Sequence, residues 1–149
     1  MPVMQRLVVS AVLMCLAVVL GGCGGASVDE GDPVQVAQVA AEAWLRSDVD
    51  GLIEVSCKKM REQLEASREE MKQMAEMMNA MGVDMKDIRF DFTDVTFEAE
   101  EVGDYTARIR MKGPLKVSIP GRADELRDQD VALEMVNEEG DWKLCSEIN

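Results

Sequence analysis

The sequence contains no histidine, and aromatic residues make up only 4% of it. Histidine is the usual proton acceptor for a serine or cysteine nucleophile and the commonest metal ligand, so its absence argues against both kinds of site. Basic residues are also scarce, with 16 Lys and Arg against 29 Asp and Glu, a net charge of −13. Such a surface repels phosphate backbones, and we expect no nucleic-acid partner and no bound cofactor.

The chain has no apolar run long enough to cross a bilayer comfortably. The longest apolar run goes from Leu7 to Leu20, and as a helix it would span about 21 Å of a roughly 30 Å hydrocarbon core. Arg6 precedes it and small residues follow it, which is the pattern of a signal peptide over residues 1–22. A short uncleaved membrane anchor is the alternative.

The end of this stretch reads Leu20-Gly21-Gly22-Cys23 and resembles the bacterial lipobox, an aliphatic residue and two small residues before a cysteine. The resemblance implies that Cys23 carries a diacylglycerol and that acyl chains hold the protein on a membrane outside the cytoplasm. Gly24, where some sorting systems read Asp as a retention signal, favours the outer membrane in a host that has one. The alternative is that Cys23 merely ends an ordinary signal.

Two of the four cysteines remain once the signal and the lipid anchor are set aside. Cys15 leaves with the signal peptide, so Cys57 and Cys145 are left in an oxidising compartment. An even number of cysteines there predicts a disulfide, and two buried free thiols are the alternative. We expect a flexible tether over residues 23–31 and one domain over residues 32–149, with 15 basic against 29 acidic residues once Arg6 is removed.

The apolar period changes once along this domain, from helical to extended. Asp32 and Pro33 predict a helix start, a second helix begins near Leu52 and carries Cys57, and residues 58–81 contain no proline or glycine. From residue 88 onward apolar and polar residues alternate, which predicts strands near 88–92, 95–97, 105–111, 115–119, 131–135 and 142–148. Gly113-Pro114 is expected to interrupt the strands, with residues 115–119 as a continuation or a further short strand, and residues 120–130 are expected to form a loop. The order predicts an α+β roll, with N-terminal helices packed on a curved antiparallel sheet of about four to five strands.

Four segments carry a resemblance to a known superfamily: Ala41-Glu42-Ala43-Trp44-Leu45, residues 47–51, residues 131–136, and residues 139–144. Together they resemble small bacterial lipoproteins of the nuclear-transport-factor-2-like superfamily, and among these the family named domain of unknown function 4878. The resemblance implies a cystatin-like fold in which a curved sheet wraps a helix, often with a conical pocket between them. That family has no established activity, so no functional residue is carried over.

Methionines form the least ordinary pattern in the chain. Met71, Met74, Met78 and Met81 are spaced three, four and three, which places them on one face of a helix. The conservative interpretation is apolar packing, because methionine fills irregular gaps. The same face would suit an apolar ligand or an envelope protein partner, and clustered thioethers would suit Cu(I).

Asp91, Asp94 and Tyr105 are the candidates for a catalytic group in a pocket. Strand alternation puts Asp91 on the face opposite Phe90 and Phe92, which indicates a solvated surface instead. We therefore expect no enzymatic activity and a non-catalytic binding or structural module. A small pocket enzyme is the alternative.

Overall fold

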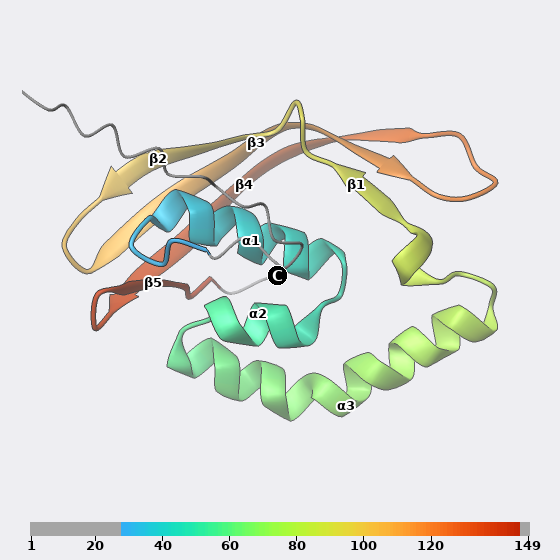
Figure 1. Ribbon diagram of the computed structural model, residues 1–149, viewed down its shortest axis with the longest axis horizontal. Coiled ribbons are helices and arrows are strands. Elements are labelled where there is room, and N and C mark those ends of the chain that lie inside the picture. The colour runs from blue at the N-terminus through green and yellow to red at the C-terminus, as the bar shows by residue number, and fades with distance from the viewer. Residues whose placement is uncertain (1–27, 147–149) are drawn as a thin grey trace, which may run out of the picture.

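The computed structural model describes residues 28–146 as three helices packed with a curved antiparallel sheet of five strands (Figure 1). This architecture confirms the predicted α+β roll. The elements, in chain order, are α1 Pro33–Leu45, α2 Val49–Val55, α3 Lys58–Ala80, the 3₁₀ turn η1 Met85–Asp87, β1 Arg89–Asp91, β2 Thr96–Val102, β3 Thr106–Ser118, β4 Glu125–Glu138 and β5 Asp141–Leu144.

Helix α1 begins where the sequence predicts. Asp32 Oδ1 accepts the Val34 N–H at 2.9 Å, and Pro33 occupies the first turn, where its missing N–H costs nothing. Small residues dominate the face that this helix buries, and they let it lie close to the sheet; they are Val36, Ala37, Ala40, Ala41 and Ala43.

The chain between α2 and α3 differs from the prediction that the second helix carries Cys57. Helix α2 ends at Val55, and Ser56 is extended and bridges to Leu144. Cys57 is the N-cap of α3, and its N–H donates to the Leu144 carbonyl at 2.8 Å. The backbone bonds to β5 therefore override the local helical preference at these two residues.

Helix α3 is continuous from Lys58 to Ala80. Among its described residues only Met60 and Leu64, both in its N-terminal half, are buried. Figure 1 shows α3 on the side of α1 and α2 opposite the sheet, with its C-terminal half extending past α2.

The described strands form a sheet in the order β1-β3-β4-β5, and β2 pairs with β3 beside β1. β3 runs unbroken through Gly113-Pro114, so the predicted interruption there was wrong. Gly113 has φ +120°, and a Cβ at this position would collide with the Asp94 carbonyl oxygen, because the turn between β1 and β2 crosses the strand here. The pair therefore marks a close approach of two backbones instead of a strand end.

β4 begins at Glu125, inside the segment predicted as a loop. Residues 125–128 are exposed, yet they pair in regular register with residues 114–117 of β3. The strand lacks an apolar alternation at this end because neither of its faces is covered, which is why the sequence pattern missed it.

Part of the predicted tether is attached to the domain. Val28 packs against the core, the Glu30 carbonyl accepts the Trp142 N–H at 2.7 Å, and Glu30 pairs with Lys143 at 3.1 Å. The predicted signal peptide, Cys23 and Ile148 lie outside the described residues. Within residues 28–146, no helix combines the length and apolarity that a membrane span requires.

Candidate functional site

Cys57 and Cys145 form a disulfide, with their Cα atoms 5.3 Å apart, which confirms the predicted pairing. Cys57 is buried at the start of α3, and Cys145 directly follows β5. The bridge therefore ties the helical layer to the last strand, beside the backbone bond from Cys57 to Leu144.

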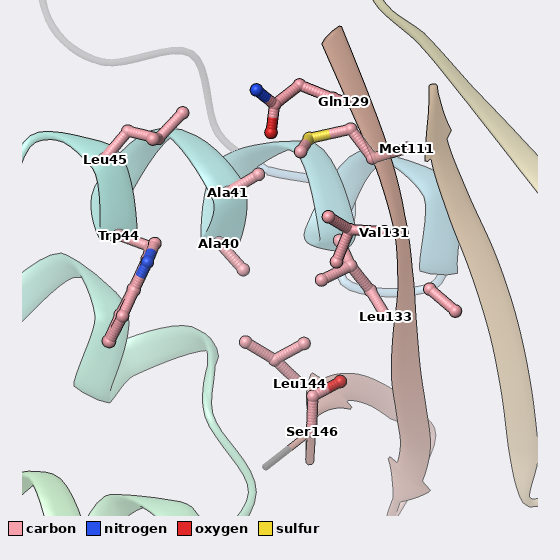
Figure 2. A pocket seen from close by; sticks show the side chains of 11 residues that line it. Ala40, Ala41, Trp44, Leu45, Met111, Gln129, Val131, Leu133, Leu144 and Ser146 are labelled. Atoms are coloured by element: carbon pink, nitrogen blue, oxygen red, sulfur yellow. The ribbon is translucent and has the colours of Figure 1, made fainter. Parts of the chain in front are cut away.

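A hollow of about 380 Å³, here named the α1–β4 pocket, opens between the C-terminal half of α1 and the inner face of the sheet (Figure 2). Its size falls within the range of small-ligand sites. The described residues that line it are mostly apolar: Ala40, Ala41, Trp44, Leu45, Met111, Gln129, Val131, Ala132, Leu133, Leu144 and Ser146.

Of these described lining residues, only Gln129 and Ser146 are polar. The Ser146 hydroxyl is occupied, since it accepts the Glu134 N–H at 2.6 Å. The Gln129 side-chain nitrogen donates to the Arg127 carbonyl at 3.1 Å, and Figure 2 shows its oxygen on the pocket side. The pocket thus offers an apolar wall with one free acceptor, and no ionisable side chain is in the lining described.

Trp44 forms a wall of the α1–β4 pocket and is 42% exposed. Its periodicity alone assigns it to the buried face of α1, with Ala40 and Ala43. A large aromatic side chain left half in water beside a hollow is typical of a site that an apolar molecule covers. The alternation of apolar and polar residues along β4 does not distinguish residues that line the pocket, such as Val131, from residues of the core.

The predicted methionine face lies on a second hollow, here named the methionine hollow, between α3 and the turn that joins α1 to α2. Its volume is about 390 Å³. Met71, Met74 and Met78 line it, whereas Met81 caps the helix, is exposed and is absent from the described lining. Met85, which the sequence did not single out, enters from η1 and adds a fourth thioether.

These methionines are not a closed core. Met74 is 59% exposed, and Met71 and Met78 are half-buried. Two cations, Arg68 and Lys72, also line the hollow, and Arg68 pairs with Asp50 at 2.6 Å. These methionine side chains are therefore only partly packed against the rest of the domain.

The candidate catalytic residues do not converge on a pocket. Asp91 is exposed, and its Oδ1 accepts the Thr93 N–H at 2.9 Å and the Thr93 hydroxyl at 2.5 Å, which lowers the pKa of Asp91 below its ordinary value. A carboxylate held ionised in this way is a poor general base near neutral pH. Asp94 and Tyr105 are exposed, and neither belongs to the described lining of the α1–β4 pocket.

Charges on the outer face of the sheet are paired across strands. Arg108 donates to Glu134 at 2.7 Å, and Arg110 donates to Asp130 at 2.6 Å. The bond from Arg110 lowers the pKa of Asp130. In the part of the chain that the structure describes, no group of three or more His, Cys, Asp or Glu residues is placed to hold a metal ion.

Comparison with known proteins adds no name to this site. No protein-family model matches the chain, and no curated protein matches it. The likeness to the nuclear-transport-factor-2-like superfamily therefore stays a prediction from the sequence.

Proposed function

We propose that this protein is a lipid-anchored envelope protein that binds an apolar molecule or side chain in the α1–β4 pocket without catalysing a reaction. The observation that carries the proposal is the half-exposed Trp44 beside a 380 Å³ apolar hollow. The lack of an ionisable group in the described lining favours binding over catalysis. The net charge of −13 disfavours anionic ligands, so the occupant is neutral or cationic.

The test is a titration of the domain, residues 24–149, with N-phenylnaphthylamine, a neutral apolar fluorophore. Binding should enhance the probe fluorescence and shift the tryptophan emission. Because this shift comes from Trp44, the Trp44→Phe variant should not show it. Val131→Trp should fill the pocket from its rim and abolish binding. Val102→Trp, at an exposed residue of β2 outside the described lining, is the matched control. Equal probe affinity in both tryptophan variants would refute this site.

The anchor is tested separately. Cys23→Ser removes the lipid acceptor, so the variant should leave the membrane fraction for the soluble fraction of the envelope. A Cys23→Ser protein that stays with the membrane would overturn the lipobox interpretation.

A second candidate function, Cu(I) binding, is favoured by one observation: Met85 joins Met71, Met74 and Met78 around a single hollow. Thioethers are soft ligands that select Cu(I). The domain should then compete for Cu(I) with a chromogenic chelator, and Met74→Leu with Met78→Leu should remove the competition. Met77→Leu, on the same helix but outside the described lining, is the control. Competition unchanged in the double variant would exclude this site.

A further inference from the structure

Half of β4 has an open outer edge. β5 pairs with β4 only over Met135–Glu138. One residue further, Glu134 bonds to the chain after β5: its carbonyl accepts the Cys145 N–H at 2.8 Å. From Glu134 back to Glu125, no strand among residues 28–146 pairs with this edge of β4.

The direction of the backbone groups along this edge follows from the bonds at its end. In an antiparallel strand, the N–H and C=O of one residue point to the same side, and the side alternates with each residue. Glu134 points toward β5, whereas Asn137 N–H donates to the Tyr105 carbonyl on the β3 side. The register of β3 and β4 runs without a shift from residue 125 to residue 136. Asp128, Asp130 and Ala132 therefore direct their N–H and C=O groups at the open edge.

The open edge lies beside the α1–β4 pocket. The odd-numbered residues of β4 carry their side chains on the inner face, and Gln129, Val131 and Leu133 line the pocket. Val131 is 42% exposed there. In a strand added along this edge, every second side chain would lie on the inner face next to Val131, where the pocket has room for it.

The other face of the same edge is acidic. Asp128 and Asp130 are both exposed on the outer side of the sheet, in a chain with a net charge of −13. Asp130 already pairs with Arg110, and Asp128 adds a further carboxylate one pleat away. Side chains of an added strand that face these aspartates would be favoured as lysine or arginine.

We propose that the open edge of β4 takes up an extended peptide in which apolar residues alternate with basic residues. The peptide adds a strand antiparallel to β4, bonds to Asp128, Asp130 and Ala132, and places its apolar side chains in the α1–β4 pocket. Main-chain bonds then supply affinity, while the pocket and the aspartates supply selectivity. The inference rests on the proposed function, because it names the class of ligand that the same pocket takes.

The test is amide hydrogen exchange by NMR on the domain, residues 24–149, with a short capped peptide of alternating lysine and valine. The amides of Asp128, Asp130 and Ala132 should exchange rapidly in the free domain and slow by at least about tenfold in the complex. Methylation of the backbone nitrogens of the lysines should abolish binding, because their backbone N–H groups donate to the main-chain carbonyls of the β4 aspartates. Methylation of the backbone nitrogens of the valines should leave binding intact, because their backbone N–H groups point away from β4.

A matched pair of chain variants checks the same edge. Ala132→Pro removes an N–H that points at the open edge and leaves the ladder with β3 intact, so the domain should fold and lose the peptide. Ala132→Val also enlarges the side chain but keeps the N–H, so it should bind the peptide more tightly than Ala132→Pro. Peptide binding by Ala132→Pro as tight as by Ala132→Val would overturn the proposal.

The remaining outcomes separate this inference from the proposed function. If N-phenylnaphthylamine binds and the peptide does not, the pocket stands and the edge proposal falls. If the three amides are already protected in the free domain, the edge has another occupant and the proposal falls. Loss of that protection in a chain that ends at Ser146 would identify residues 147–149 as the occupant, and dependence of the protection on protein concentration would identify a second copy. If neither probe binds, both proposals fall.

Discussion

The disulfide between Cys57 and Cys145 should be the largest single contribution to stability that one chemical change can remove. The two residues are 88 positions apart, and the chain-entropy model assigns about 4–5 kcal/mol to a loop of that length. A domain of this size has a total unfolding free energy of about 5–15 kcal/mol. Loss of the bridge should therefore remove at least about a quarter of the unfolding free energy.

The perturbation is the double substitution Cys57→Ala with Cys145→Ala, and the assay is urea unfolding followed by circular dichroism and by the fluorescence of the buried Trp142. The midpoint should fall, and the m-value should rise because the unfolded chain is no longer cross-linked and exposes more surface. Treatment with a reductant should shift the wild-type midpoint by a similar amount and leave the double variant unchanged. A loss of less than about 1 kcal/mol would refute the assignment of this bridge as the main restraint on the unfolded chain.

Two further substitutions test local features. Gly113→Ala should lower the free energy of unfolding by clearly more than Gly121→Ala. Both glycines have positive φ, but only a Cβ at position 113 meets the Asp94 carbonyl oxygen. Urea unfolding of the two variants measures the difference, and equal losses would contradict the close approach. The pKa of Glu30 is lowered by its hydrogen bond and attraction to Lys143, so this pair stabilises the fold above the ordinary pKa of 4.5 and the contribution is lost as pH falls through the lowered value. In Glu30→Gln the melting temperature should fall less steeply than in the wild type as the pH is lowered below 4.5. An equally steep fall in both proteins would contradict this prediction.

The sequence was sufficient where a single local signal dominated. Asp32 and Pro33 predicted the start of α1, and an even cysteine count, read together with a predicted export signal, predicted the Cys57–Cys145 bridge. Each of these signals depends on residues that act on their own backbone or on each other. No distant contact competes with them.

The sequence was insufficient where a distant backbone decided the outcome. Cys57 follows a helical pattern, yet a bond to Leu144 keeps it extended. Gly113 looks like a strand end, yet it accommodates the turn at Asp94. The same reason explains the site: the methionine spacing located one wall of the methionine hollow, but only the fold could bring Met85 to it from another element.

The packing of Val28 against the core and the bonds from Glu30 to β5 leave only a short connection between the domain and Cys23. Four residues, 24–27, separate Cys23 from Val28, and fully extended they reach about 17 Å. In the proposed lipid-anchored form, acyl chains on Cys23 would hold the end of the domain where Glu30 meets Trp142 next to the headgroups. Under that proposal the pocket would sample only the layer beside the membrane, and a ligand would have to reach that layer to bind.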